Sequence, residues 1–460
     1  MYRLFVGLAV VVVLAKCDTP IFVQPEQVHL SYGGDATRMW VTWTTLAPIS
    51  EEPQVEYGSG PGFLDHQVTG ETSLFNAPIA NGAFRNIYVH RVLLQHLQPG
   101  KTYMYHVGCV DGWSSIFFFR ALKSGPAGYR YAVFGDMGNK NARSIGQLQQ
   151  LSQRGHFDMI LHVGDLAYDL NTYNATYGDI FMRKIEPMAA YVPYMTVPGN
   201  HESANNFTHY VSRFSMPGGS ANLFYSFDLG PAHFIGFSTE LYFFYGTRTT
   251  LVENQFKWLL NDLIKANQNR YRVPWIITMA HRPMYCSNAD SDDCTKYESV
   301  TRTGGKVFKD FALERLFYKY GVDLEIWAHE HSYERMWPVY NRTVYNGTAN
   351  PYNDPPAPVH IISGSAGCQE DTDGFVKFPP PWSAVRSSEY GFARMIVSNS
   401  SHLYFEQLSS DGKKLIDSFW LRKTSHGPYS DENRDKFKGV YVPYSYRHKG
   451  EKYCKGCADI

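Results

Sequence analysis

A short apolar segment that ends in a carboxylate constrains this chain more than any other feature of its sequence. Residues 159–163 read Met-Ile-Leu-His-Val and are followed by Gly164 and Asp165, with Tyr168 three positions later. The run is typical of a strand buried on both faces of a sheet. Asp165 is then expected at the carboxyl end of this strand, where open α/β sheets bind their ligands. A single Gly-Asp pair is ordinary turn chemistry, so the prediction depends on whether the pattern recurs.

Four further strand-like segments end in residues that can bind a metal. These are 131–134 before Asp136, 194–197 before Asn200, 275–279 before His281, and 322–327 before His329 and His331. Carboxylates, amide oxygens and imidazoles gathered on loops are ligands that first-row transition metals take. Each one alone has a structural explanation, such as a hydrogen-bonded core histidine or a solvated turn. Five strand ends that all carry such residues predict a metal site.

Helical segments alternate with these strands and predict an α/β domain at 126–422. Strands that alternate with helices indicate sheet layers covered by helices. The expected helices are 142–153, 253–266 and 307–320, of which the second places apolar residues on one face. β-character returns after residue 335, and we expect these strands on the edge of the domain: 359–362, 392–397, 402–406 and 415–421.

Residues 18–125 lack this alternation and predict a separate all-β sandwich. Short segments rich in β-branched and aromatic residues are separated there by Gly, Pro and Asp. They are 27–32, 39–43, 87–93, 103–107 and 116–119. The stretch 97–103 resembles the tyrosine corner of fibronectin type III domains, in which the hydroxyl of Tyr103 would bind upstream backbone. Residues 423–460 form a polar tail that we expect to be loosely ordered.

The charge balance indicates no nucleic-acid partner. Lys plus Arg and Asp plus Glu are 43 each, so the chain has neither a basic footprint nor an acidic tail. No apolar run reaches the ~18 residues that a transmembrane helix needs, so no membrane span is predicted. The 460 residues suffice for about two or three domains with a buried core. The sequence indicates no particular oligomeric state.

The first residues are typical of a secretory signal peptide at 1–17. Arg3 precedes an apolar run at 4–14 and a small-residue stretch at 15–17. An N-terminal buried strand is the alternative, but nothing polar alternates within the run. We therefore expect a secreted protein, with extracellular and lysosomal destinations both open.

Sequons and cysteines agree with an oxidising, lumenal compartment. Five Asn-X-Ser/Thr sequons mark glycosylation sites at Asn174, Asn206, Asn341, Asn346 and Asn399. Cys286 and Cys294 bracket a polar loop and make a plausible local disulfide. Cys454 and Cys457 could form a second one, although a lone CxxC pair is weak evidence for redox or zinc chemistry.

Taken in order, the five blocks resemble the metallophosphoesterases, and Tyr168 makes the resemblance specific to the purple acid phosphatases. Three blocks carry it as they stand here: Gly-Asp-x-Gly at 135–138, Gly-Asp-x-x-Tyr at 164–168 and Gly-Asn-His-Glu at 199–202. Segments 213–217 and 279–286 resemble the animal long-form branch, the acid phosphatase type 7 group. The resemblance reaches to about residue 421. It implies a four-layer α-β-β-α metallophosphoesterase catalytic domain behind a fibronectin III-like domain.

Two positions depart from the family's pattern. Ala328 stands where the family usually has Gly, a small change that should preserve the neighbouring ligands. No histidine occurs in the loop between Cys286 and Cys294, where the family's proton donor would stand.

The resemblance also implies a dinuclear cofactor. Asp136, Asp165, Tyr168 and His331 correspond to the ligands of Fe(III), and a phenolate is a strong anionic donor that suits a trivalent ion. Asp165, Asn200, His281 and His329 correspond to the ligands of a divalent partner, which is zinc, iron or manganese. Asp165 would bridge the two ions, and the remaining positive charge would attract a phosphate dianion.

The function that this implies is hydrolysis of phosphomonoesters at acid pH by a metal-bound hydroxide, without a phosphoenzyme. His201 is expected to touch phosphate or the leaving group, and Glu202 to orient a histidine. Glu330 and Asp290 are the alternative proton donors to His201, because each could be a carboxylic acid held protonated by its surroundings.

Two other functions compete with this interpretation. The first is phosphodiester or nucleotide pyrophosphate cleavage with two divalent ions, against which Tyr168 argues. The second is a non-enzymatic secreted binding or adhesion protein with a vestigial metal site. A decayed site should have lost a ligand, whereas every expected ligand is present here.

Overall fold

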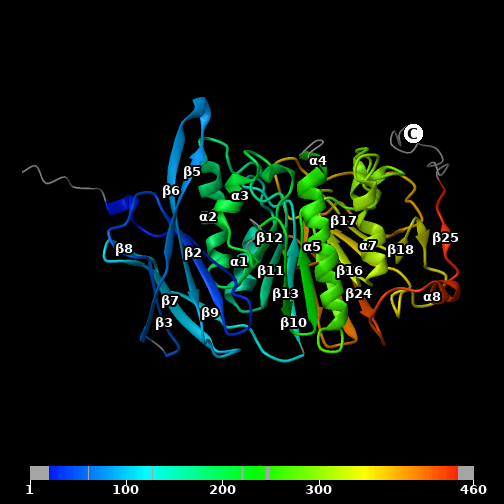
Figure 1. Ribbon diagram of the computed structural model, residues 1–460, viewed down its shortest axis with the longest axis horizontal. Helices are drawn as coiled ribbons and strands as arrows, with labels where there is room; N and C mark the ends of the chain where they lie inside the picture. The colour runs from blue at the N-terminus through cyan, green and yellow to red at the C-terminus, as the bar shows by residue number, and fades with distance from the viewer. Residues whose placement is uncertain (1–19, 61, 127, 219–221, 245–248, 444–460) are drawn as a thin grey trace, which may run out of the picture.

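The computed structural model describes residues 20–60, 62–126, 128–218, 222–244 and 249–443 (Figure 1). The predicted signal peptide and the pair Cys454 and Cys457 lie outside these residues. An all-β part at one end of the long axis, blue to cyan, adjoins a larger α/β part, green to red. Among the described helices, none combines the length and apolar character needed to cross a membrane.

The N-terminal part is a sandwich of two antiparallel sheets. One sheet has the order β1 (Glu26–Tyr32), β2 (Met39–Thr45), β6 (Phe84–Leu94) and β5 (Glu71–Pro78). The other has the order β4 (His66–Thr69), β3 (Gln54–Gly58), β7 (Thr102–Cys109) and β8 (Gly112–Trp113), with β9 (Phe117–Arg120) also paired to β7. The hydroxyl of Tyr103 accepts a hydrogen bond from the backbone N–H of Gln98 at 2.9 Å, which confirms the predicted tyrosine corner.

The first sheet of the α/β part has six strands. Its order is β12 (Tyr194–Val197), β11 (Met159–Val163), β10 (Tyr129–Phe134), β22 (Gly391–Val397), β23 (His402–Ser409) and β24 (Leu415–Arg422). β10, β11 and β12 run parallel, and β22 pairs antiparallel with β10. β11 and β12 are fully buried, and β10 is buried except at Arg130, as their largely apolar sequences predict.

The second sheet has seven strands. Its order is β13 (Tyr225–Leu229), β14 (Ala232–Gly236), β15 (Trp275–Met279), β16 (Leu324–Trp327), β20 (Val359–Ser363), β17 (Tyr333–Met336) and β21 (Ser383–Ser387). β14, β15, β16 and β20 run parallel. A small separate sheet joins β18 (Val339–Tyr340), β19 (Thr343–Val344) and β25 (Val440–Tyr441).

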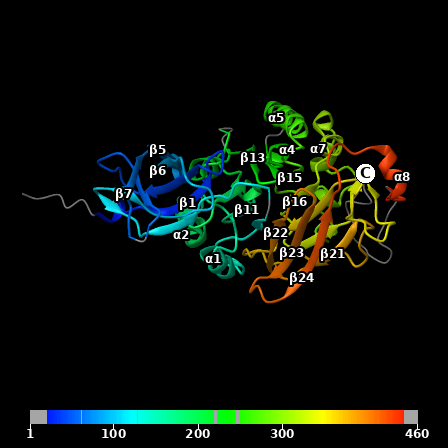
Figure 2. The ribbon, with the colours of Figure 1, turned by 90° about the horizontal axis from the view of Figure 1, so that it is seen from below.

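Helices cover the outer faces of both sheets, so the α/β part has four layers (Figure 2). Leu148 of α1 (Ile145–Gln153) and Phe181 of α2 (Thr176–Ala189) share the core of the six-stranded sheet. Leu259 of α5 (Thr249–Gln268) and Phe317 of α7 (Leu313–Lys319) pack with Ile276 of the seven-stranded sheet. The predicted fold class, an all-β sandwich with a four-layer α/β domain, is confirmed.

Short helices occupy the connections. They are η1 (Pro20–Phe22), η2 (Ala80–Gly82), η3 (Asn200–Glu202), α3 (Thr208–Arg213), α4 (Leu241–Phe244), η4 (Asp293–Thr295), α6 (Val300–Thr303), η5 (Lys309–Phe311) and α8 (Asp431–Lys436). The predicted single helix at 307–320 is wrong, because Ala312 is extended and separates η5 from α7. Phe308 and Leu313 are both buried. On one continuous helix they would lie about 140° apart, so the break lets both enter the core.

Two other expectations about the C-terminal half are wrong. β20 lies inside the seven-stranded sheet between β16 and β17, not at an edge. The described part of the tail is packed rather than loosely ordered: the amine of Lys423 pairs with the buried Asp323, and Val442 lies in the core. A buried carboxylate that needs a cation therefore anchors the start of the tail.

Candidate metal centre

The predicted ligands meet at the carboxyl ends of strands from both sheets of the α/β part. β10, β11 and β12 of the six-stranded sheet lead into Asp136, Asp165 and Asn200. β15 and β16 of the seven-stranded sheet lead into His281 and His329. Parallel strands end at the same edge of a sheet, and the two stacked sheets bring these loops to one point.

The ligand loops require unusual backbone. Asp136, Asp165, Tyr168 and His329 have positive φ angles of 56°, 50°, 57° and 72°. For non-glycine residues such conformations cost roughly 1–3 kcal/mol each and persist only where the surrounding structure holds them. A Cβ atom added to Gly199 would lie 2.2 Å from Oδ1 of Asp165, so only glycine allows this approach of two ligand loops.

Ala328, one of the two departures from the family's pattern, fits closely. A Cβ atom added to Gly135 would lie 2.4 Å from the Cβ atom of Ala328. The alanine methyl group therefore occupies the space that a glycine at 135 leaves. The backbone N–H of His329 donates to Oδ2 of Asp136 at 3.0 Å.

One half of the site gathers around the Tyr168 phenol. Its oxygen lies 2.8 Å from Nε2 of His331 and 3.2 Å from Oδ1 of Asp136. Nε2 of His331 lies 3.6 Å from the same Asp136 oxygen. The other ring nitrogen of His331, Nδ1, lies 3.0 Å from the backbone oxygen of Asp371, which fixes the ring with Nε2 toward Tyr168.

The other half gathers around Nε2 of His281. This atom lies 3.1 Å from Oδ2 of Asp165, 3.1 Å from Oδ1 of Asn200 and 3.2 Å from Nδ1 of His329. The Nδ1 atom of His281 lies 2.9 Å from the backbone oxygen of Val163, so that carbonyl sets the ring's orientation. Asp165, His281 and His329 offer ligand atoms that all lie within 4.8 Å of one another.

The donor set fits two metal ions. Oδ2 of Asp165 is buried and has no hydrogen-bond partner that satisfies it, and Nε2 of His281 is the ligand atom that lies 3.1 Å from it. Nε2 of His281 also lies 4.0 Å from Oδ1 of Asp136, so the two halves adjoin. Buried oxygen and imidazole donors without compensating hydrogen bonds are unfavourable unless a cation satisfies them. This chain therefore presents a site for a dinuclear metal centre.

The pKa values of Asp136 and His281 show that the buried carboxylates favour a positive charge at the site. Burial, together with the charge of Asp165, raises the pKa of Asp136 well above its usual range. Burial lowers the pKa of His281, but the Asp165 and Asp136 carboxylates outweigh it and raise that pKa to about 10. Without metal, the carboxylates retain a proton on His281, which a bound cation would replace.

Glu202 acts on the backbone of the ligand loops, and the predicted contact with a histidine is wrong. Its carboxylate accepts hydrogen bonds from the N–H groups of Asp165, Leu166 and Gly199, at 2.9, 3.0 and 2.9 Å. Burial and the nearby Asp165 charge raise the pKa of Glu202 to about 7. Glu202 thereby joins two ligand loops, because it lies at the short turn that follows Asn200.

His201 faces the centre without joining either group of ligands. Nδ1 of His201 lies 2.8 Å from Oδ1 of Asp169, and its ring packs on Tyr168 with centroids 4.3 Å apart. Its Nε2 atom lies 3.9 Å from Oδ2 of Asp165. Burial lowers the pKa of His201, but Asp169 and Asp165 outweigh it and raise that pKa to about 9. The His201 side chain is partly exposed, and its Nε2 atom also lies 3.7 Å from Oε1 of Glu370.

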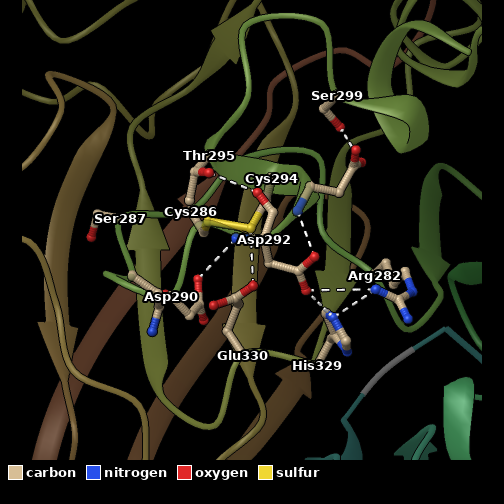
Figure 3. Close-up of a disulfide and its surroundings, with 12 residues drawn as sticks. Arg282, Cys286, Ser287, Asp290, Asp292, Cys294, Thr295, Ser299, His329 and Glu330 are labelled. Carbon is tan, nitrogen blue, oxygen red and sulfur yellow. Dashed lines mark hydrogen bonds and ion pairs between the residues drawn. A yellow bond between two sulfur atoms is a disulfide. The ribbon is translucent and has the colours of Figure 1, made fainter. Parts of the chain in front are cut away.

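Glu330 points toward the loop between Cys286 and Cys294 (Figure 3). The two cysteines form a disulfide, and Oε1 of Glu330 lies 3.0 Å from the sulfur of Cys294. Glu330 is buried, and burial raises the pKa of its carboxyl group well above its usual range. Among the described cysteines, Cys109 and Cys368 are free.

Asp292 is a residue of the site that the sequence did not predict. Its carboxylate contacts Nε2 of His329 at short range and lies 3.5 Å from Nη1 of Arg282 (Figure 3). Burial raises the pKa of Asp292, but the hydrogen bond with His329 outweighs it and holds that pKa well below its usual range. Only folding brings this loop carboxylate to a ligand that is 37 positions away in the sequence.

Family profiles match most of the chain. "Purple acid Phosphatase, N-terminal domain" matches residues 25–121, "Calcineurin-like phosphoesterase" matches 129–333, and "Iron/zinc purple acid phosphatase-like protein C" matches 357–418. Acid phosphatase type 7 of Mus musculus is 54% identical over 87% of this chain and 91% of its own length. The Homo sapiens protein of that name is 53% identical over 88% of this chain and 92% of its own length.

A solved structure shares the fold. The purple acid phosphatase PPD1 from yellow lupin seeds superposes with a TM-score of 0.72 at 25% identity, over 87% of this chain and 74% of its own. The animal relatives, the three profiles and the converging ligand residues all agree. This chain therefore belongs to the purple acid phosphatase family of metallophosphoesterases.

Proposed function

We propose that this chain is a secreted acid phosphatase that hydrolyses phosphomonoesters at an Fe(III) centre with a divalent partner, zinc, iron or manganese. The observation that carries this proposal is the position of the Tyr168 oxygen, 2.8 Å from Nε2 of His331. A phenolate beside an imidazole and the Asp136 carboxylate suits a trivalent ion, and iron is bound by tyrosine in other proteins. The names of the animal relatives, acid phosphatase type 7, support the substrate class.

The residues divide the work between the two ions. Asp136, Tyr168 and His331 would hold the trivalent ion, Asn200, His281 and His329 would hold the divalent one, and Asp165 would bridge them. Two ions held by these residues would clamp the phosphate oxygens and would lower the pKa of water, so that hydroxide is available at acid pH. The Glu202 carboxylate holds the Asp165 and Asn200 loops together, because it accepts hydrogen bonds from three of their backbone N–H groups.

His201 is the proposed proton donor to the leaving group. Asp169 holds Nδ1, so a proton on Nε2 faces the space next to Asp165. An alkoxide needs this proton as the phosphorus–oxygen bond breaks, and acid catalysis of this kind contributes about 10²–10⁴-fold. Glu330 is less favourable as a donor because its carboxylate turns toward the Cys286–Cys294 disulfide.

Comparison of a monoester with a diester tests the reaction class. The purified protein should release nitrophenol from nitrophenyl phosphate at pH 5 far faster than from bis(nitrophenyl) phosphate. Iron and the divalent metals are measured on the same sample, and Asp165→Asn serves as the inactive control. A higher rate on the diester, from protein that contains two divalent ions, would support a phosphodiesterase. Protein that contains both metals but hydrolyses neither ester would support a binding protein.

We also propose the secretory route and glycosylation at five sequons. Asn174, Asn206, Asn341, Asn346 and Asn399 are all exposed, as oligosaccharide attachment requires. The Cys286–Cys294 disulfide agrees with an oxidising compartment. N-terminal sequencing of the mature protein should begin at Asp18. Digestion with an endoglycosidase should lower its apparent mass, and material from lysosomes and from the medium distinguishes the two destinations.

A further inference from the structure

We propose that Asp292 positions the ligand His329, so that the disulfide-closed loop between Cys286 and Cys294 supports the divalent half of the metal centre. This inference rests on the proposed dinuclear function. It assigns a role to a loop that contains no histidine and therefore no imidazole proton donor of its own.

The two ring nitrogens of His329 face opposite ways. Nδ1 lies 3.2 Å from Nε2 of His281 and so points to the ligand group. Nε2 contacts Oδ2 of Asp292 on the outer side (Figure 3). An imidazole that binds a metal through Nδ1 carries its hydrogen on Nε2, and a carboxylate that accepts this hydrogen fixes both the tautomer and the ring orientation.

The Asp292 carboxylate is itself held in place. Its second oxygen, Oδ1, accepts a hydrogen bond from the N–H of Asp293 at 2.6 Å. Its backbone oxygen accepts from the hydroxyl of Thr295 at 2.7 Å, which closes the short helix η4. Cys294 lies in that helix and is bonded to Cys286, so the disulfide closes the loop that carries Asp292.

Arg282 places a second hydrogen-bond donor beside the ring of His329, so the Asp292 carboxylate is needed there as an acceptor. Nη1 of Arg282 lies 2.9 Å from Nε2 of His329 and 3.5 Å from Oδ2 of Asp292, while its Nε atom donates to the buried Glu240 at 3.0 Å. A guanidinium has no acceptor, and Nε2 of a metal-binding His329 has none either. Asp292 supplies the acceptor that both donors need, and without it two N–H groups would face each other.

The test compares Asp292→Ala and Asp292→Asn with the matched control Glu298→Gln. Glu298 follows the loop and is exposed, so its variant makes the same change from carboxylate to amide away from the ring of His329. Each purified holoenzyme is dialysed against graded concentrations of a chelator, and iron and the divalent metal are measured separately. Visible absorbance reports the Tyr168 half, and thermal melting reports folding.

We expect Asp292→Ala to weaken retention of the divalent ion about 10- to 100-fold, the usual effect of removing such a carboxylate. Iron content, visible absorbance and melting should stay close to wild type. Asp292→Asn keeps an acceptor oxygen without the charge, so its loss should be smaller. Glu298→Gln should match wild type. The double variant Asp292→Ala/Arg282→Met should regain part of the loss, because the opposing donor is gone.

A second pair of substitutions tests the loop. Joint replacement of Cys286 and Cys294 by serine should lower divalent-ion retention in the same direction as Asp292→Ala. The inference is overturned if Asp292→Ala and Asp292→Asn both retain the divalent ion within about twofold of wild type, or if iron is lost in parallel. Wild-type protein that binds no second metal would instead contradict the dinuclear function itself.

Discussion

The oxygen of Tyr168 lies 2.8 Å from Nε2 of His331, although 163 positions separate the two residues in the sequence. Tyr168 follows a strand of one sheet and His331 follows a strand of the other, so the contact exists only because the sheets stack. Burial raises the pKa of Tyr168 well above its usual range, with further contributions from Asp136 and Asp165. A phenol in such a place ionises only when a strong cation binds it, which is the basis of the first prediction.

Tyr168→Phe should abolish the visible absorbance of the iron-loaded protein. The wild type is expected to absorb visible light through charge transfer from the phenolate to Fe(III), and phenylalanine has no oxygen to donate. Absorption spectra with metal analysis of both proteins check this. Stoichiometric wild-type protein that is colourless when oxidised would contradict the trivalent ion and favour two divalent ions.

Asp165→Asn should lose both ions, whereas Asn200→Ala should lose mainly the divalent ion. Asp165 lies 3.1 Å from Nε2 of His281 and its charge also raises the pKa of Asp136, so it acts on both halves. Asn200 contacts only the His281 group among the predicted ligands. Metal content per chain separates the two cases. Full occupancy of both ions in Asp165→Asn would show that Asp165 is not the bridge.

His201→Ala should lose more activity on an alkyl phosphate than on nitrophenyl phosphate. A nitrophenolate leaves almost without a proton, whereas an alkoxide requires one, so the difference should approach the roughly 10²–10⁴-fold of positioned acid catalysis. The rates kcat/KM on both substrates are compared at matched metal content. Equal losses on both would mean that His201 only binds phosphate, and the donor would have to be sought elsewhere.

His233 should stabilise the fold at acid and neutral pH but not at alkaline pH. Burial lowers its pKa, but Asp228 at 2.6 Å and Asp262 at 2.9 Å outweigh it and raise that pKa to about 9. The folded pKa lies above the unfolded value of about 6.5, so this stabilisation is complete below pH 6.5 and disappears as the pH rises through 9. It amounts to roughly 3 kcal/mol, from about 1.4 kcal/mol per pH unit.

The measurement is the free energy of unfolding of wild type and His233→Asn between pH 5.5 and 9.5. The difference between the two proteins should shrink steadily above pH 6.5. His66→Asn is the control, because the His66 side chain is exposed, and it should leave stability unchanged. A difference that does not vary with pH would show that the His233 ring contributes by packing alone.

Asp179→Asn should destabilise the protein strongly because it leaves Arg213 buried without a counter-ion. Asp179 of α2 pairs at 2.8 Å with Arg213, whose side chain is fully buried, and at 2.5 Å with Arg85 of the N-terminal part. Loss of one member of a buried ion pair costs about 3–5 kcal/mol. Denaturant unfolding measures it. The exposed pair Glu253 and Lys257 is the control, and Glu253→Gln should cost no more than about 0.5 kcal/mol.

The sequence determined the strands of the sheets and the residues at their ends. Residues 159–163, 194–197 and 275–279 form strands with the predicted bounds, because a continuous apolar run closed by a polar residue is a local signal. The type of each following residue, carboxylate, amide or imidazole, is also local information. The stacking of four layers was implied by the resemblance, and the strand order was not predicted, since no local pattern specifies which strands meet.

The tertiary structure decided what depends on distant partners. α2 (Thr176–Ala189) was not predicted, and the helix expected at 307–320 is broken because two core residues need different faces. Glu202 was expected on a histidine but binds the backbone of the Asp165 loop. Asp292 gave no signal in a polar loop, because its meaning comes from the approach of His329 through folding. Local pattern therefore identified the ligands, and long-range packing identified the residues that hold them in position.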